Sequence, residues 1–336
     1  MAAVRYLRIF LSAFLATIAL VPATPPSVAQ EKPRQPPVHG PPPPFFNALS
    51  YEDAVRYSDG GTEVEHHRTP ADELAEHRRI ARSLAALAPQ RKGVVDAYVV
   101  SIALDSDGNF SREAREAARV LARRYDAAGR SITLAGPDGR GGVDLPRGSP
   151  AHLGLVLARI AEVMDRAEDV LVLYTTSHGA RIGVVYNDGD NGFGIISPAR
   201  LAAMLDGLGI KRRLVIVSAC YSGSFVPALS DGDSAVLTAS VGDRTSFGCQ
   251  ADNDWTFFGD ALINQALRKA QPLDLAAAEA ARLVSEWEAR GRLQPSLPQC
   301  FIGDRAKLWL AALDQRTPKA ATAPVGTPAV TLLDKR

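Results

Sequence analysis

Two short apolar runs, each followed closely by a reactive side chain, constrain the fold of this chain more than any other feature. The run at 170–176 (VLVLYTT) ends two residues before His178, and the run at 214–217 (LVIV) ends three residues before Cys220. Such near-continuous runs are typical of central strands buried on both faces of a sheet. In open α/β sheets, chemistry takes place beyond the carboxyl ends of the strands. The pattern therefore predicts a cysteine nucleophile and a histidine base on neighbouring strands.

Strand and helix patterns alternate through most of the chain. Strands are predicted at 94–104, 131–135, 170–176, 214–217 and 235–240, and helices from Ser111, Ser149, Ser197, Phe258 and Leu273. Serine caps and a proline at the first helical position favour several of these helix starts. The repeated alternation predicts an α/β fold with a mostly parallel central sheet and helices on both faces. Asn187-Asp188-Gly189 predicts a hairpin turn.

The flanking segments differ in composition from this alternating core at 91–315. Residues 1–29 combine early arginines, an apolar stretch and a small-x-small ending, which is the pattern of a signal peptide. An uncleaved membrane anchor is the alternative interpretation. Residues 30–50 are Pro-rich and predict a tether, 51–90 predict a helical extension, and 316–336 predict a disordered tail. The chain is therefore expected to be exported, either to the periplasm or to the medium.

Charge and hydrophobicity exclude some classes of partner. The 336 residues carry a formal net charge of +1 and are 46% hydrophobic. This balance gives no indication of nucleic-acid binding or of an anionic membrane surface as partner. After the first segment no run is long and apolar enough to span a bilayer, so no span is expected once a signal peptide is cleaved. The oligomeric state does not follow from the sequence.

The three cysteines are Cys220, Cys249 and Cys300. An exported chain can form disulfides, and an odd number of cysteines leaves at least one thiol free. A bridge between Cys249 and Cys300 would leave Cys220 as the free thiol. Spacing alone does not establish that bridge.

Cys220 and His178 have complementary chemistry. A thiol is mostly protonated at neutral pH, so a nucleophilic cysteine needs a base or a cation beside it, and a histidine supplies either. The backbone N–H groups of Gly179 and Cys220 are candidate donors to a developing oxyanion. A buried core cysteine and a structural histidine are the alternatives, and the matching strand-end positions favour the catalytic interpretation.

Several motifs together resemble the legumain-like cysteine peptidases, most closely the exported bacterial branch. They are TSHG at 176–179, SACYSG at 218–223, TASVGDRTSFGC at 238–249 and the later FGD at 258–260. The resemblance covers about 92–304. It implies a caspase-like three-layer α/β sandwich, with Cys220 as nucleophile and His178 as general base. It also implies acyl-enzyme chemistry on a protein or peptide substrate, with no metal and no cofactor.

The resemblance also implies a specificity pocket, because legumain-like enzymes typically cleave after Asn or Asp. Arg112 matches the family's pocket arginine, Thr245 lies near its hydroxyl position, and Asp260 matches its acidic position. Ser218 stands where the family has a glutamate, and Glu113 stands where it has a pocket histidine. These departures put Asn specificity in question but leave the catalytic pair intact.

Competing interpretations remain open at this point. Arg112 and Asp260 could lie on a solvated helix face, with Arg244 as a rival pocket cation. Residues 105–109 (DSDGN) resemble a calcium loop, but Phe110 occupies the position that requires glycine, which favours a strand–helix connection. The expected activity is peptide-bond hydrolysis. A transamidase with the same two residues and a non-catalytic envelope scaffold are the alternatives.

Overall fold

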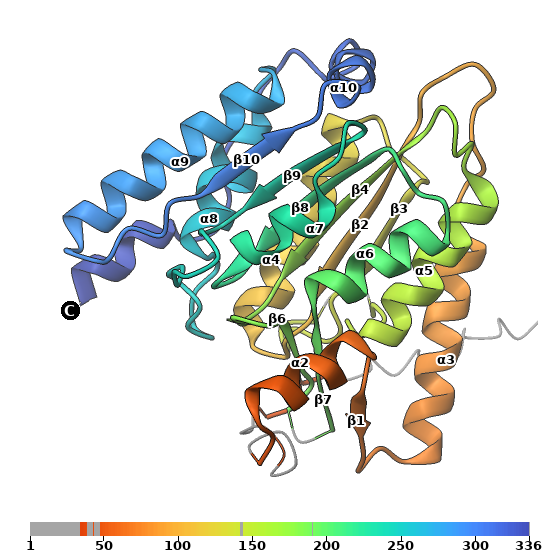
Figure 1. Ribbon diagram of the computed structural model, residues 1–336, viewed down its shortest axis with the longest axis vertical. Coiled ribbons are helices and arrows are strands. Elements are labelled where there is room, and N and C mark those ends of the chain that lie inside the picture. The colour runs from red at the N-terminus through yellow and green to blue at the C-terminus, as the bar shows by residue number, and fades with distance from the viewer. Residues whose placement is uncertain (1–33, 39–42, 44–47, 142–143, 190, 336) are drawn as a thin grey trace, which may run out of the picture. The chain divides into compact units, whose positions relative to one another are not determined.

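The computed structural model describes residues 34–38, 43, 48–141, 144–189 and 191–335 (Figure 1). The predicted signal peptide at 1–29 lies outside the described residues, as does most of the predicted tether. Within the described part of the chain, no helix combines the length and the apolar character needed to cross a membrane.

A six-stranded sheet forms the centre of the fold, in the order β10-β9-β8-β4-β2-β3 (Figure 1). Its strands are β2 (Ala97–Ala103), β3 (Ser131–Leu134), β4 (Val170–Thr176), β8 (Arg213–Ser218), β9 (Ser234–Thr238) and β10 (Gln299–Ile302). The strands from β3 to β9 pair in parallel, and β10 joins the edge antiparallel to β9. The predicted mostly parallel sheet is confirmed.

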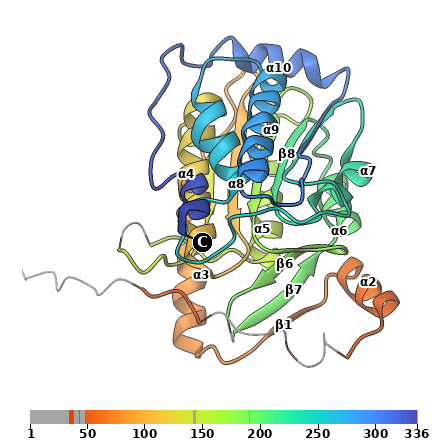
Figure 2. The ribbon, with the colours of Figure 1, turned by 90° about the vertical axis from the view of Figure 1, so that its left-hand side faces the viewer.

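Helices cover both faces of this sheet (Figure 2). One face carries α4 (Gly108–Arg124), α8 (Phe257–Gly259), α9 (Leu273–Arg290) and α10 (Ala306–Asp314); the other carries α3 (Pro70–Ala85), α5 (Pro150–Val163), α6 (Pro198–Gly207) and α7 (Val226–Leu229). Successive strand residues divide between the two cores, with Val99 and Val172 facing one and Val100 and Leu173 facing the other. Side chains alternate between the two faces of the sheet, and both faces are buried. The strands are therefore apolar at nearly every position. The predicted three-layer arrangement is confirmed.

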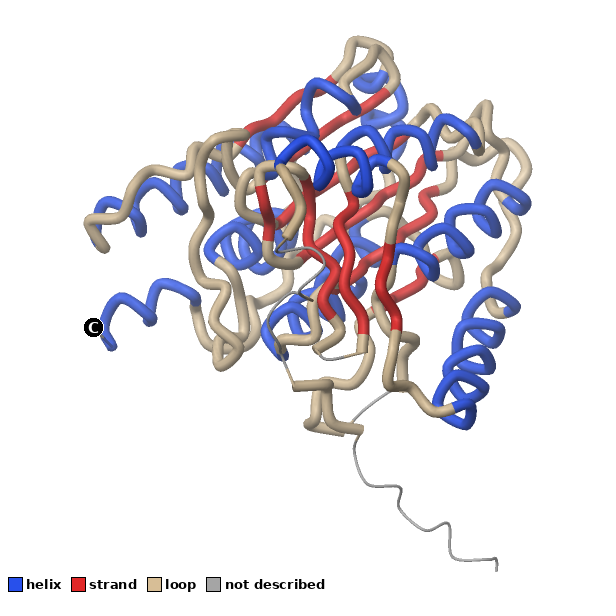
Figure 3. The backbone as a smooth tube through the Cα atoms, turned by 60° about the horizontal axis from the view of Figure 1, so that its bottom comes forward, coloured by secondary structure: helices blue, strands red, loops and turns tan. Residues whose placement is uncertain are grey.

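A smaller antiparallel sheet lies at one end of the central sheet (Figure 3). It contains β1 (Glu63–Glu65), β7 (Gly192–Ile196), β6 (Gly183–Asn187) and β5 (Gly179–Ala180), in that order. The β6–β7 hairpin turns where Asn187-Asp188-Gly189 predicted, with Gly189 at a φ of +61°. The segment at 51–90 folds as α2 (Tyr51–Asp59), β1 and α3. The predicted helical extension thus also contributes an edge strand.

The end of the chain differs from its prediction. Residues 317–335 pack against the domain and finish in a 3₁₀ helix, η4 (Ala329–Lys335). The backbone N–H of Ala329 donates to Asp260 at 2.7 Å, and that of Val325 donates to Asn264 at 2.9 Å. The predicted disordered tail is therefore wrong for these residues. The cause is that the partners are buried polar groups elsewhere in the chain, which the composition of the tail does not reveal.

Candidate active site

The carboxyl ends of β4 and β8 place His178 and Cys220 beside each other in the fold. Thr176 pairs with Ser218 in the parallel register, and each reactive residue follows two positions later. A Cβ on Gly179 would lie only 2.0 Å from the carbonyl oxygen of Cys220. Only glycine permits so close an approach between the two strand-end segments. The predicted neighbouring strands are confirmed, and the contact explains the glycine after the histidine.

The sulfur of Cys220 contacts two hydrogen-bond donors and one acceptor, the Ser246 carbonyl at 3.5 Å. The thiol of Cys249 donates to the sulfur, and so does the backbone N–H of Ser246 at an N–S distance of 3.2 Å. These bonds, with a smaller contribution from the charge of His178, lower the pKa of Cys220 to about 6, although burial opposes them. Donors to the charged form favour it, so at neutral pH this half-buried residue is mostly thiolate, the nucleophilic form.

The ring of His178 lies between Phe110 and Asp107. The Phe110 ring meets it edge-on, with 5.0 Å between centroids, and Asp107 Oδ2 lies 3.6 Å from His178 Nε2. Asp107 is the N-cap residue of α4, yet its side chain makes no capping bond to the helix. The N-cap predicted at Ser111 lies four residues earlier, at Asp107; the Ser111 hydroxyl donates instead to the carbonyl of Ala135 at 2.8 Å.

Asp105 lies close to the same pair. Ligand-type atoms of Asp105, Asp107 and His178 lie within 4.8 Å of one another, which makes them the candidate cation ligands in the described part of the chain. The carboxylate of Asp105 accepts the backbone N–H of Asp107 at 2.9 Å. This bond forms an Asx turn between β2 and α4, as the strand–helix interpretation predicted. The expectation of no metal stays a prediction.

The backbone around Cys220 is sharply turned. Tyr221 has a φ of +58°, and its N–H donates to the carbonyl of Arg244 at 2.8 Å. Gly179 lies on β5, directly against the Cys220 backbone. The two residues predicted to supply oxyanion donors are thus adjacent. Their role stays a prediction.

Glu113 organises a buried polar cluster beneath the strand ends. Its Oε1 accepts from Tyr174 at 2.5 Å and Thr176 at 2.8 Å, and from Ser218 at 3.1 Å. Its Oε2 accepts the backbone N–H of Thr256 at 2.7 Å. Ser218 is therefore an interior residue that contacts Glu113 and Thr256, and its role in a substrate pocket stays a prediction.

The other three predicted pocket residues lie in different environments. Arg112 donates to the carbonyls of Ala251 and Asn253, and pairs with Asp254 at 3.1 Å. Thr245 is partly exposed and immediately precedes the loop residue that contacts Cys220.

Asp260 is 1% exposed, and burial raises its pKa, while its bonds to Asn264 and Ala329 oppose that shift. Asp260 therefore lies in the interior, and its role in a substrate pocket stays a prediction. Its carboxylate holds the C-terminal segment.

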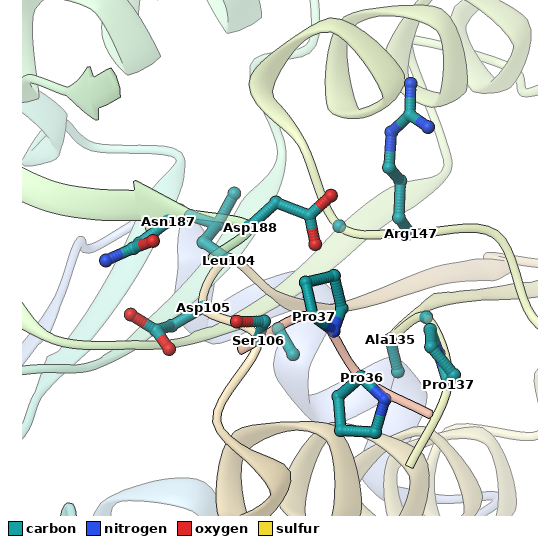
Figure 4. A pocket seen from close by; sticks show the side chains of 13 residues that line it. Pro36, Pro37, Leu104, Asp105, Ser106, Ala135, Pro137, Arg147, Asn187 and Asp188 are labelled. Atoms are coloured by element: carbon teal, nitrogen blue, oxygen red, sulfur yellow. The ribbon is translucent and has the colours of Figure 1, made fainter. Parts of the chain in front are cut away.

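A small hollow lies next to Asp105 at the ends of β2 and β3 (Figure 4). Pro36 and Pro37 from the predicted tether line it, together with Ser106, Arg147 and Asp188. The backbone N–H of Gly139 donates to the carbonyl of Arg34 at 3.2 Å. The described part of the tether is thus in contact with the domain, although it has no secondary structure of its own.

Two residues near the site had other interpretations from the sequence. The sequence places Asp107 in the apparent calcium loop and leaves a bridge between Cys249 and Cys300 open. All three cysteines are free in the structure, and Cys249 contacts Cys220. Cys300 lies on β10 and lines a separate pocket with Leu273 and Leu310. The only sequence signal for the contact between Cys249 and Cys220 is the position of Cys249 after the SACYSG motif. That position does not reveal how the intervening loop folds.

Comparisons with known proteins address the family. The model of the Peptidase C13 family matches residues 154–287, which include both His178 and Cys220. The structure is similar to the crystal structure of caspase-1 from Spodoptera frugiperda, with a TM-score of 0.42 and 14% identity, covering 65% of this chain and 93% of that one. A comparison with curated proteins finds no match. The segment that carries His178 and Cys220 is therefore similar to the Peptidase C13 family of cysteine peptidases.

Proposed function

We propose that this protein is an exported cysteine endopeptidase that hydrolyses peptide bonds with Cys220 and His178. One observation carries the proposal: adjacent strand ends present the two side chains, and hydrogen bonds from Cys249 and Ser246 lower the pKa of Cys220 to about 6. An activated thiolate beside a histidine is the arrangement that nucleophilic catalysis by cysteine requires.

The reaction proceeds in two steps. The Cys220 thiolate attacks the scissile carbonyl carbon, and the amides of Gly179 and Cys220 stabilise the oxyanion. The C–N bond then breaks, His178 protonates the departing amine, and a thioester remains on Cys220. His178 next takes a proton from water, the resulting hydroxide attacks the thioester, and the carboxylic acid leaves as the thiolate re-forms. Neither step changes an oxidation state, so the reaction needs no oxidant or reductant.

The substrate is a protein or peptide, with cleavage after Asn or Asp. The family resemblance supports this preference, and Arg112 and Thr245 are partly exposed near the site. Arg112 already donates hydrogen bonds to the carbonyls of Ala251 and Asn253. A substrate carboxylate or amide that contacts Arg112 would therefore also lie against the loop that contains these two residues. Probes bearing Asn, Asp or Leu before the reactive group compare the three preferences directly.

Export follows from the N-terminal pattern at 1–29. Cleavage near Ala29 would release a mature chain that begins at Gln30. N-terminal sequencing of the protein from an envelope or medium fraction tests this. An intact Met1 in a membrane fraction would instead support an anchor.

The central test labels the purified mature chain with a thiol-reactive peptidyl probe and maps the labelled cysteine by mass spectrometry. Labelling of Cys220 that is lost in His178→Ala supports the dyad, with Cys300→Ala as the matched control that keeps labelling. Hydrolysis that persists in Cys220→Ala refutes the proposal. Equal labelling of all three cysteines favours the scaffold.

Turnover with and without an added amine nucleophile distinguishes the two enzymatic outcomes. Hydrolysis gives only the free carboxylic acid. An amide product that grows with the amine concentration identifies a transamidase.

A further inference from the structure

Cys249 lies on the loop that covers the sulfur of Cys220. The Cys249 thiol donates a hydrogen bond to that sulfur, and the backbone of Ser246, three residues earlier, donates a second one at 3.2 Å. Both cysteines are free thiols in the structure. The nucleophile of the proposed mechanism therefore has a second thiol as a direct neighbour.

The position of Cys249 is held by the backbone on either side of it. Gly248 has a φ of +93°, and a Cβ there would lie 2.9 Å from backbone atoms of Thr256 and Phe257. The Phe257 N–H donates to the carbonyl of Phe247 at 2.9 Å, and the Asn253 side chain donates to that of Gly248 at 2.9 Å. Cys249 itself packs against the cluster that contains Phe110. The contact with Cys220 is thus a fixed feature of the loop.

We propose that Cys249 is a resolving thiol that captures oxidised Cys220 in a reversible disulfide, with a hydroperoxide as the oxidant. The proposal rests on Cys220 being the reactive nucleophile of the proposed function. It assigns to this loop a thiol-modification site that protects the nucleophile from irreversible oxidation.

The chemistry balances in two steps. The Cys220 thiolate attacks one oxygen of hydrogen peroxide, the O–O bond breaks, and Cys220 sulfenic acid and hydroxide form. The sulfur of Cys249 then attacks the sulfenic sulfur; the S–S bond forms, the S–O bond breaks, and the hydroxyl leaves as water with the Cys249 proton. The peroxide takes up two electrons, one from each sulfur in the final disulfide. A thiol reductant reduces the disulfide and returns both cysteines to thiols.

Electrostatics favours this order of events. The hydrogen bond to the Cys220 sulfur, together with burial and the negative charges of Cys220, Glu113 and Asp105, raises the pKa of Cys249 well above its usual range. Cys249 is therefore a protonated donor while Cys220 is a thiolate. Oxidation to the neutral sulfenic acid removes the negative charge on Cys220. The Cys249 thiol then loses its proton more easily, so Cys249 becomes nucleophilic once a sulfenic acid is present.

Tryptic digestion separates the three cysteines, which makes the test direct. Cys220 lies in the peptide 214–244, Cys249 in 245–268 and Cys300 in 293–305. The full chain is reduced, freed of reductant, treated with stoichiometric hydrogen peroxide, alkylated and digested without reductant. The expected product is peptide 214–244 linked to 245–268 by a disulfide, with Cys300 alkylated. Cys300→Ser, the matched control, gives the same linked product.

The Cys249→Ala variant gives the complementary result. In a several-fold excess of hydrogen peroxide and without a resolving thiol, Cys220 sulfenic acid reacts with further peroxide to sulfinic and sulfonic acid, and dithiothreitol no longer restores probe labelling. In the native chain dithiothreitol restores most of the labelling. If the alanine variant folds poorly, Cys249→Ser replaces it, because serine keeps a side chain of similar size. The same outcome is expected for Cys249→Ser.

The readouts distinguish this inference from the proposed function. Untreated, reduced protein is labelled with the probe in parallel. Labelling at Cys220 combined with over-oxidation and no link to Cys249 overturns the resolving role and leaves the peptidase proposal standing. A failure to label Cys220 in the reduced protein is the result that rejects the nucleophile itself.

Discussion

The carboxylate of Asp107 lies 3.6 Å from Nε2 of His178, across the junction between β2 and β4. Asp107 occupies the N-cap of α4 without capping it, while the Asp105 carboxylate holds its backbone through the Asx turn. The helix start therefore fixes where this carboxylate stands relative to the imidazole. A carboxylate at one ring nitrogen orients the other toward its reaction partner.

Replacing Asp107 by Asn is expected to impair the proton-transfer step more than substrate binding. Asn keeps the size of the side chain but removes the charge that holds the imidazole orientation. We expect kcat to fall on the order of 10-fold to 100-fold while KM changes less than about 3-fold. Steady-state kinetics on a peptide substrate checks this. Asp304→Asn, at an exposed carboxylate far from the site, is the matched control and should leave kcat unchanged. An equal change in kcat and KM, in a variant whose melting temperature is unchanged, would contradict a positioning role.

The reactivity of Cys220 should depend on pH in a specific way. Its pKa of about 6 lies below that of an ordinary thiol, so the thiolate predominates above pH 6 and the thiol below it. The rate of alkylation by iodoacetamide should rise with a midpoint near pH 6. In Cys249→Ala the midpoint should move upward, because the first donor to the thiolate is lost. Cys300, an exposed thiol on β10, serves as an internal control. A native midpoint near that of a free thiol would refute the donor arrangement.

The strands and the reactive pair were predictable because their signals are local. The runs at 170–176 and 214–217 are apolar at every position, and parallel strands bring their carboxyl ends to one edge. The contact of Cys249 with Cys220 was not predictable in this way. It depends on the path of the loop at 245–256, which is held by Thr256, Phe257 and Asn253.

The surroundings of the pocket candidates were not predictable for a related reason. Aligning a motif places a residue on an element, but it does not say which neighbours its side chain meets. Asp260 aligns with an acidic pocket position, yet here its carboxylate bonds to Asn264 and Ala329. Glu113 replaces a histidine in the motif and instead joins the strands beneath the site. Long-range packing decides both outcomes.

Glu113→Ala should destabilise the protein strongly. It removes an acceptor from three hydroxyls and one backbone N–H that are all buried, and each unsatisfied group costs about 1–3 kcal/mol. A loss of about 3 kcal/mol or more is expected in urea unfolding. Glu113→Gln keeps an acceptor and should cost about half as much. Glu286→Ala, at an exposed pair with Arg282, is the matched control with a change below about 0.5 kcal/mol. A small effect of Glu113→Ala would show that the cluster is not a structural anchor.

Truncation after Thr317 should lower the melting temperature, because the C-terminal segment supplies partners to buried groups. Removing it strips the Trp255 indole of the Val325 carbonyl at 2.8 Å, and Asp260 of the Ala329 N–H. It also uncovers the core around the buried Ala329 side chain. These lost hydrogen bonds and this exposure together correspond to about 3 kcal/mol. Differential scanning fluorimetry of the truncated and full chains measures the shift. Asp260→Asn in the full chain separates the contributions: it keeps an acceptor for Ala329 and should lower the melting temperature less than truncation does. If truncation leaves the melting temperature unchanged, the contacts of this segment do not stabilise the fold.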